Sequence, residues 1–340
     1  MEQKKHEVWL VTGAAGFIGS HLAEALLSMG KTVVGIDNFA TGRRENISFL
    51  DDYTRTNKAG DFCFREIDIT DRKSLKDLFA EVRPSHVLHQ AALGSVPRSI
   101  ENPLNSHSSN VDGFINVLDV ARLSGVRRLV YASSSSVYGD SAESPKREGI
   151  IGECLSPYAA TKRINEIYAQ VYGKTYGLET VGLRYFNVFG PRQDPNGPYA
   201  AVIPRWLALL RKGQGVTIFG DGSTSRDFCY VKNVVQANLQ AAQVPSTSSV
   251  INGVVNIACG DTTSLLTLEK MLRETVGQYL KIDPVEIPSP TFEDFRKGDI
   301  KHSLASIELA SSGLDYAPSH TVLDGIRELV KYELNSDKLI

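Results

Sequence analysis

The sequence predicts an α/β protein whose core is a doubly wound parallel sheet, followed by a smaller mixed α/β unit. Three observations support this prediction. A glycine-rich turn joins the first apolar run to a helical pattern, an acidic residue ends the second apolar run, and strand and helix patterns alternate through the first half of the 340-residue chain. Such alternation is typical of parallel sheets covered by helices on both faces.

The glycine-rich turn comes first. A short apolar run ends at Val11, residues 12–19 read TGAAGFIG, and a helical pattern follows. Gly13 allows a tight turn, Gly16 lets the backbone approach a pyrophosphate, and Gly19 lets the helix pack against the strand. The N-terminus of the helix then points at the bound anion. This order of strand, turn and helix predicts a Rossmann-like unit that binds a dinucleotide.

The second strand supplies the acidic residue. It covers residues 32–36 and ends in Asp37, eighteen residues after Gly19. A carboxylate at this position accepts a hydrogen bond from the ribose 2′-hydroxyl and repels a 2′-phosphate, so NAD is favoured over NADP. Arg43 and Arg44 follow and weaken that preference slightly. We expect both arginines in a surface loop.

Further strands and helices continue the alternation. We expect the cofactor at the carboxyl ends of the parallel strands. Asp68 and Ile69 follow one strand end and residues 89–92 follow another, so both segments are expected to reach the cofactor. The predicted strands are residues 62–67, 86–89, 129–132 and 180–183, and the predicted helices are residues 74–82, residues 110–123 and the segment that begins at Pro157.

The pattern changes after Arg184, where the chain becomes rich in turn-forming residues. We therefore predict an NAD-binding Rossmann domain over residues 1–188 and a substrate domain over residues 189–340. The segment 231–260 is expected to return to the first domain. Within the second domain we expect a helix over residues 203–210, a strand over residues 216–219, a helix over residues 265–276 and two closing helices.

A candidate proton-transfer pair lies at the start of the helix near Pro157. Ser156 is suited to the N-cap and Pro157 to the first turn, which places Tyr158 and Lys162, four residues apart, on one face. An ammonium near a phenol lowers the pKa of the phenol, so we expect Lys162 to make Tyr158 a usable base. The serines at 133–136 end the preceding strand, where one hydroxyl can bridge Tyr158 and a substrate hydroxyl.

The composition argues against several kinds of partner. With 37 basic and 39 acidic residues, the chain has no basic footprint for nucleic acid. Its start is polar and no apolar run approaches membrane length, so we expect a cytoplasmic protein without a membrane partner. We predict no metal site, because His86 and His89 are expected to be structural residues of a buried strand. The four cysteines, Cys63, Cys154, Cys229 and Cys259, have no metal-binding or disulfide spacing.

Together these motifs resemble the extended short-chain dehydrogenase/reductase family over essentially the whole chain. The motifs are residues 12–19, Asp37-Asn38, Ser134 before Tyr138-Gly139, Tyr158-x-x-x-Lys162 and Tyr185-Phe-Asn187. Within that family, residues 89–99, 192–197 and 222–230 resemble the UDP-N-acetylglucosamine 4-epimerases of bacterial surface-polysaccharide pathways.

The resemblance implies a UDP-sugar substrate and an NAD that stays tightly bound and is recycled in each turnover. It implies that Tyr158 takes the proton of the sugar 4-hydroxyl, that Lys162 binds the nicotinamide ribose, and that Ser134 is the bridging hydroxyl. The implied cofactor-binding residues are Gly13, Gly16, Phe17, Ile18, Gly19, Asp37, Asn38, Asp68, Ile69, Gln90, Ala91, Ala92, Tyr158, Lys162 and Tyr185.

The resemblance also implies a substrate site, with a small residue at Ser303 admitting a 2-acetamido group. Thr217 and Phe219 depart from the more polar residues of close relatives, which leaves the uracil-side contacts open. Arg226 and Arg296 are expected to hold the diphosphate, and Asp299 the uridine ribose. The implied substrate-binding residues are Ser95, Arg98, Ser135, Ser136, Asn187, Ala201, Val202, Trp206, Arg226, Arg296, Asp299 and Ser303.

Several alternatives stay open at this point. The substrate is expected to be UDP-GlcNAc or UDP-GalNAc, with a UDP-uronic acid or UDP-glucose/galactose as rivals. A 4,6-dehydratase or a decarboxylating relative is disfavoured, because Ser135 and Ser136 stand where those enzymes carry acidic residues. A non-catalytic NAD-binding module is disfavoured because Tyr158 and Lys162 are both present. Relatives often form homodimers through a four-helix bundle, so we expect one here from the helix over 110–123 and the helix after Tyr158.

Overall fold

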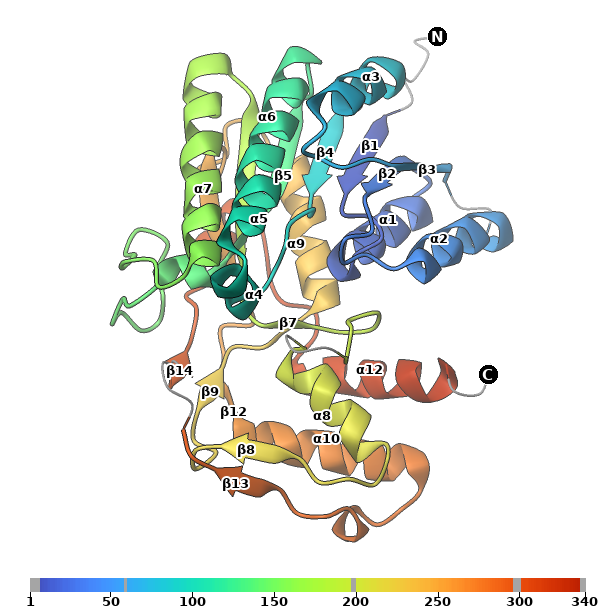
Figure 1. The fold of residues 1–340 in the computed structure, drawn as a ribbon, viewed down its shortest axis with the longest axis vertical. Helices are drawn as coiled ribbons and strands as arrows, with labels where there is room; N and C mark the ends of the chain where they lie inside the picture. Colours follow the sequence, from blue (N-terminus) through green and yellow to red (C-terminus); the bar gives the residue numbers. More distant parts are fainter. Residues whose placement is uncertain (1–6, 58–59, 197–199, 296–300, 337–340) are drawn as a thin grey trace.

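A seven-stranded parallel sheet forms the centre of the computed structural model, which describes residues 7–57, 60–196, 200–295 and 301–336 (Figure 1). The strand order is β11-β6-β5-β4-β1-β2-β3, which is doubly wound as predicted. The strands are β1 (Val8–Thr12), β2 (Thr32–Asp37), β3 (Phe62–Glu66), β4 (His86–His89), β5 (Arg128–Ser134), β6 (Glu179–Tyr185) and β11 (Gly253–Ile257).

Helices cover both faces of this sheet, and each face has its own apolar core. One core joins the sheet to α1, α2, α9 and α11, and includes Leu22, Ala237 and Ala310. The other joins it to α3, α6 and α7, and includes Phe79, Phe114 and Ala169. The helices are α1 (Phe17–Ser28), α2 (Arg44–Asn57), α3 (Arg72–Val82), α6 (Gly113–Leu123), α7 (Pro157–Tyr176), α9 (Val231–Gln243) and α11 (Glu308–Leu314).

The segment 231–260 contributes one strand, β11, to this sheet and one helix, α9, to its covering layer. β11 pairs in parallel with β6, with Gly253 opposite Val181 and Ile257 opposite Tyr185. Helix α9 packs on the same face as α1, and its residues Val234 and Ala237 are fully buried. The end of the sheet therefore depends on a stretch of chain far from the other six strands in sequence.

Two local features differ from the sequence prediction. The expectation that Arg44 lies in a surface loop is wrong, because Arg44 begins α2, where it stacks over Phe39 at 4.0 Å and pairs with Glu66 at 3.2 Å. The helix expected from residue 110 begins as a π-helical segment, η1 (Ser108–Asp112), before α6. Two short helices, α4 (Val96–Glu101) and α5 (Pro103–His107), precede it and were not predicted.

The C-terminal unit, formed by most of the remaining elements, lies beyond the carboxyl ends of the sheet strands and has its own core (Figure 1). Trp206, Leu268 and Ile326 are buried there, and Trp206 is only 2% exposed. These elements are α8 (Val202–Leu210), α10 (Leu265–Leu280) and α12 (Val322–Ser336), with the short strands β7 (Val188–Phe189), β8 (Thr217–Phe219), β9 (Ser225–Arg226), β10 (Cys229–Tyr230), β12 (Thr263–Ser264), β13 (Thr291–Glu293) and β14 (His302–Ser303), and the 3₁₀ turn η3 (Pro284–Glu286). The 3₁₀ turn η2 (Ser135–Tyr138) instead follows β5 directly, and its Val137 and Tyr138 pack in a small separate cluster with Phe186.

Candidate active site

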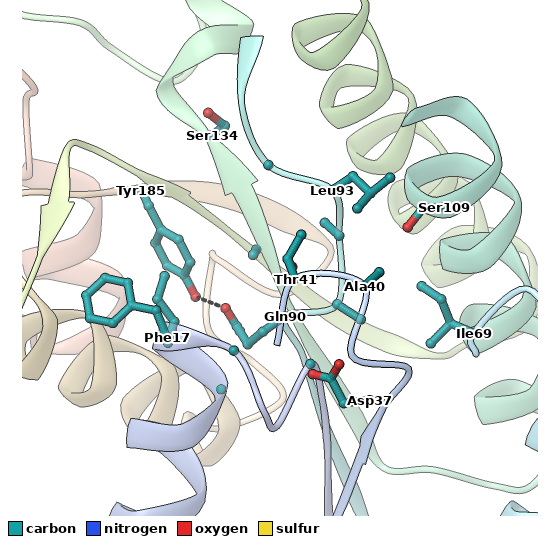
Figure 2. Close-up of a pocket in the computed structure, with 18 of the residues that line it drawn as sticks. Phe17, Asp37, Ala40, Thr41, Ile69, Gln90, Leu93, Ser109, Ser134 and Tyr185 are labelled. Atoms are coloured by element: carbon teal, nitrogen blue, oxygen red, sulfur yellow. Dashed lines mark hydrogen bonds between the residues drawn. The ribbon is translucent and has the colours of Figure 1, made fainter. Parts of the chain in front are cut away.

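A cavity of about 410 Å³ lies at the carboxyl ends of the central strands (Figure 2). This is where ligands bind in doubly wound sheets. Figure 2 shows Asp37 from the end of β2 and Ser134 from the end of β5 among its lining side chains. The predicted site residues that line it are Gly13, Gly16, Phe17, Ile18, Gly19, Asp37, Asn38, Ile69, Gln90, Ala91, Ala92, Ser134, Tyr158, Lys162, Tyr185 and Asn187.

The glycine turn forms one wall of this cavity, and its backbone is packed too closely for side chains. Gly13 has φ +70°, and a Cβ on it would lie 2.8 Å from the Ala91 nitrogen. A Cβ on Gly19 would lie 2.0 Å from the Gly13 oxygen. Gly16 is the N-cap of α1 and has no side chain to cap the first helical N–H groups. These groups therefore face the cavity as donors, which fits the pyrophosphate of a dinucleotide.

Asp37 ends β2 and lines the same cavity as the glycine turn. Its carboxylate is 8% exposed and accepts from the backbone nitrogens of Ala15 at 3.0 Å and Phe39 at 2.8 Å. Burial raises the pKa of Asp37, and these hydrogen bonds oppose that rise. The neighbouring Asn38 also lines the cavity, and its amide donates to Asp68 at 2.7 Å. Asp68 was predicted to touch the cofactor, but it contacts Asn38 and does not line the cavity.

Tyr158 and Lys162 enter the cavity from the first turns of α7. The predicted N-cap is confirmed, because the Ser156 hydroxyl accepts from the Ala159 nitrogen at 3.1 Å. Lys162 is 3% exposed, and its Nζ donates to the carbonyl oxygen of Ala132 at 2.8 Å. The same Nζ lies 5.9 Å from the centroid of the Tyr158 ring. Both side chains thus share one helix face and one cavity, as the four-residue spacing predicts.

The pKa values in this site depend mainly on burial. Burial raises the pKa of Tyr158, and a hydrogen bond with Ser134 opposes the rise. Burial lowers the pKa of Lys162 to about 8, and the negative charge of Glu166 opposes that fall. The predicted lowering of the Tyr158 pKa by Lys162 is not found in the protein alone, because the ammonium donates to a backbone carbonyl and lies beside the ring.

A triangle of hydrogen bonds fixes two other lining residues. The Tyr185 hydroxyl donates to the Gln90 side-chain oxygen at 3.2 Å, as Figure 2 shows. The Gln90 amide donates to Asn238 at 3.2 Å, and the Asn238 amide donates to the Tyr185 hydroxyl at 2.8 Å. Asn238 lies on α9 and is fully buried. Sequence reasoning did not find Asn238, because its partners lie 148 and 53 residues away along the chain.

A second cavity, of about 190 Å³, lies next to α8 and β8. Asn187 lines both cavities, so the two meet at this residue. The Asn187 amide donates to the carbonyl oxygen of Asp227 at 3.0 Å, which fixes its side chain between β7 and β10. Four predicted substrate residues line this cavity together with the divergent pair Thr217 and Phe219; they are Asn187, Val202, Trp206 and Arg226.

Other predicted substrate residues line neither cavity. Ser95 caps α4 by accepting from the Arg98 nitrogen at 3.3 Å. Ser303 pairs with Arg226 across β14 and β9, so it lies one strand from the second cavity. Ser135 and Ser136 lie in η2, Ala201 is the N-cap of α8 next to the lining residue Ala200, and Arg296 and Asp299 lie outside the described residues.

Some lining residues were missed by sequence reasoning. Leu93, Gly94 and Ser109 line the first cavity from the segment between β4 and α6; none of them was named as a site residue, although Leu93 and Gly94 lie in the motif of residues 89–99. Arg205 and Phe228 line the second cavity.

Within the described ranges, no cluster of three or more His, Cys, Asp or Glu side chains could hold a metal ion. In the same part of the chain, no helix is long and apolar enough to cross a membrane.

Comparison with known proteins decides the family. Residues 9–258 match the model of the NAD dependent epimerase/dehydratase family. The chain belongs to this family. It is 36% identical to a UDP-glucose 4-epimerase of Mycolicibacterium smegmatis over 97% of this chain and 99% of that protein. The family is NAD-dependent, so the predictions of an enzyme and of NAD as its cofactor are confirmed.

Solved structures of epimerases share the fold over nearly the whole chain. A UDP-N-acetylglucosamine 4-epimerase from Methanobrevibacter ruminantium, in complex with UDP-N-acetylmuramic acid, is 36% identical with a TM-score of 0.86, covering 98% of this chain and 100% of that one. A UDP-glucuronic acid 4-epimerase from Bacillus cereus, in complex with UDP-glucuronic acid and NAD, is 29% identical with a TM-score of 0.80, covering 97% and 99%. The predicted doubly wound fold is therefore confirmed.

Proposed function

We propose that this protein is an NAD-dependent 4-epimerase of UDP-sugars, and that its substrates are UDP-N-acetylhexosamines, UDP-GlcNAc and UDP-GalNAc. The main support for this activity is that Tyr158 and Ser134 line the same cavity as the glycine turn. A base and a dinucleotide can therefore act on one sugar carbon. The relatives named above are 4-epimerases of three UDP-sugar classes. They support the type of reaction, and the choice of a UDP-N-acetylhexosamine as the substrate is our more specific proposal.

Each residue of the site has a separate role in the proposed reaction. The glycine turn and Asp37 hold the dinucleotide, and Lys162 orients its nicotinamide ribose. NAD⁺ bound in this cavity would supply the acceptor for the C4 hydride of the sugar and would add a positive charge to the cavity that Tyr158 lines. A nearby cation favours phenolate, so it offsets the burial that raises the pKa of Tyr158. Tyr158 then takes the proton of the 4-hydroxyl, with Ser134 bridging the two oxygens, and the sugar becomes a 4-keto sugar. This intermediate turns over in the cavity, and Tyr158 returns the proton to the 4-oxygen as C4 is reduced on its other face, which inverts C4.

The proton transfer is tested by Tyr158→Phe. This change removes the hydroxyl and keeps the ring, so we expect kcat to fall by at least about 100-fold while the purified protein still carries NAD. The measurements are epimerisation of UDP-GlcNAc by NMR and release of NAD on denaturation. Tyr172→Phe is the matched control, because Tyr172 lies on the same helix away from both cavities. Turnover that survives Tyr158→Phe would remove Tyr158 from the mechanism.

The sugar preference rests on the size of the residue at position 303. Ser303 carries a small side chain and pairs with Arg226, which lines the second cavity. A small residue leaves room for a 2-acetamido group, whereas a bulky aromatic side chain would fill that room. Arg226 and Arg296 are proposed to hold the diphosphate and Asp299 the uridine ribose. Guanidinium groups suit this role because they bind phosphate oxygens in pairs.

The proposed gate is tested by Ser303→Tyr. We expect turnover of UDP-GlcNAc and UDP-GalNAc to be lost, because the phenol ring occupies the space of the acetamido group, and turnover of UDP-galactose to remain. NMR of product mixtures with each sugar, UDP-glucuronate included, measures this. Equal activity of the variant on acetamido and plain sugars would contradict the gate. Preferred turnover of UDP-glucuronate by the unmodified protein would contradict the proposed substrate.

We also propose a homodimer in which α6 and α7 of two copies form a four-helix bundle. α7 carries exposed apolar side chains at Ile167, Tyr168 and Val171, which are 47%, 41% and 48% exposed, and Leu123 at the end of α6 is 55% exposed. Contiguous apolar surface of this kind is typical of protein interfaces.

The domain division at residues 188 and 189 also remains a proposal; it falls beside Asn187, where the two cavities meet.

The dimer is tested by the double change Ile167→Glu and Val171→Glu. Two buried carboxylates on each copy would oppose association, so we expect a monomer in analytical ultracentrifugation. Leu266→Glu with Val285→Glu is the control, because both residues are exposed on the C-terminal unit. A wild-type protein that sediments as a monomer, or a double variant that stays dimeric, would overturn the proposal.

A further inference from the structure

One face of α7 carries a third polar side chain beyond Tyr158 and Lys162. Residues spaced by four along a helix lie on the same face, and the next position in that series is Glu166. The facing segment is the end of β5. Three consecutive residues of β5 each meet one member of the series: Ser134 hydrogen-bonds with Tyr158, the Ala132 carbonyl accepts from Lys162 at 2.8 Å, and the Ser133 hydroxyl donates to Glu166 at 2.6 Å.

Glu166 is a buried carboxylate whose oxygens are all used. It is 4% exposed and accepts from Arg184 through Nε at 2.8 Å and Nη2 at 2.9 Å. Arg163 donates to it at 3.0 Å. Burial opposes ionisation, yet the hydrogen bonds and charge of Arg184 keep the pKa of Glu166 below its ordinary value. The carboxylate is therefore negative, and it lies one turn from the Lys162 ammonium.

We propose that Glu166 is a positioning residue for the epimerase reaction: its carboxylate fixes the end of β5 against α7 and supplies the negative charge that keeps Lys162 an ammonium. This inference rests on the proposed function. It assigns work to a residue outside both cavities, since Glu166 lines neither. The fixed end of β5 carries Ser134, so the same contact sets the bridging hydroxyl relative to Tyr158.

Few charged groups surround Lys162, so the effect of Glu166 is open to test. On its own helix Lys162 has Tyr158, Arg163 and Glu166, and β4 brings His89. Burial lowers the pKa of His89 to about 3, so this imidazole is neutral at working pH. From β6, the guanidinium of Arg184 is paired to Glu166 itself. Among the described residues, Glu166 is the acid whose charge raises the pKa of Lys162.

The sign of the expected effect follows from this arrangement. The pKa of Lys162 is about 8, and removing a nearby negative charge lowers it further. The ammonium is then lost at lower pH, so the alkaline limb of the kcat profile moves to lower pH. Removing the positive charge of Arg163 acts in the opposite direction, because it leaves the field of Glu166 stronger at Lys162.

The experiment compares kcat for UDP-sugar epimerisation from pH 6 to pH 10 in wild type, Glu166→Gln and Arg163→Gln, with rates normalised to NAD-loaded protein. For Glu166→Gln we expect kcat below wild type by roughly five-fold at pH 8.5 and by less than about two-fold at pH 6.5. For Arg163→Gln we expect the alkaline limb to move to higher pH. Ser133→Ala keeps every charge, so kcat should fall with no movement of the limb.

A matched control separates this role from a merely structural one. Glu269 is also 4% exposed, and it pairs with Arg273 through Nε at 2.8 Å on α10, outside both cavities. Glu269→Gln should lower the melting temperature and leave the pH profile unchanged. If the alkaline limb of the kcat profile stays at the wild-type pH in Glu166→Gln, the inference is wrong. If Glu166→Gln does not fold, an alkaline limb that stays at the wild-type pH in Arg163→Gln contradicts the inference instead. A wild-type protein without epimerase activity would instead overturn the proposed function.

Discussion

The contact between α7 and the end of β5 determines where chemistry can take place in this protein. Lys162 is buried, and its ammonium donates to the Ala132 carbonyl at 2.8 Å. A buried ammonium without a partner is costly, so this hydrogen bond favours one position of the helix relative to the strand. Because β5 lies next to β4 and β4 next to β1, the same contact brings Tyr158 to the cavity that the glycine turn lines.

Burial controls the protonation of the two central groups of the site, because it raises the pKa of Tyr158 and lowers the pKa of Lys162. The pKa of the Tyr158 phenol is raised in the protein alone, so little of the phenolate base is present at working pH until a further positive charge lies close to the phenol. This couples the proposed base to the proposed cofactor. Polar groups in and behind the cavity wall are paired with one another: Glu166 with Arg184, and Gln90 with Tyr185 and Asn238. Paired groups keep the cavity wall rigid, which a reaction at one sugar carbon requires.

The sequence predicted the parts of the fold and site that depend on local patterns. The glycine turn, the acid at Asp37 and the helix that starts at Pro157 follow from spacing and turn chemistry, and the structure has each of them. The N-cap at Ser156 and the shared face of Tyr158 and Lys162 follow from the helical repeat.

Features that depend on distant residues were not predictable in the same way. Asn238 joins the Gln90–Tyr185 pair from a helix much later in the chain, and Glu166 meets Ser133 only because α7 packs on β5. Helix α2, which begins at Arg44, was not predicted, and only Arg43 and Arg44 were expected in a surface loop; the buried apolar positions of α2, Ile47 and Leu50, are few among polar residues. The pKa of Tyr158 also depends on burial, which spacing alone does not give.

The most direct test of the account follows the hydrogen at carbon four. UDP-GlcNAc carrying deuterium at C4 is incubated with the protein as purified, without added NAD and with natural-abundance water, and the UDP-GalNAc product is examined by NMR and mass spectrometry. We expect the product to keep its deuterium at C4, because Tyr158 moves only the hydroxyl proton and the C4 hydrogen returns to the sugar inside the cavity. A product that has exchanged this deuterium for solvent hydrogen would contradict it.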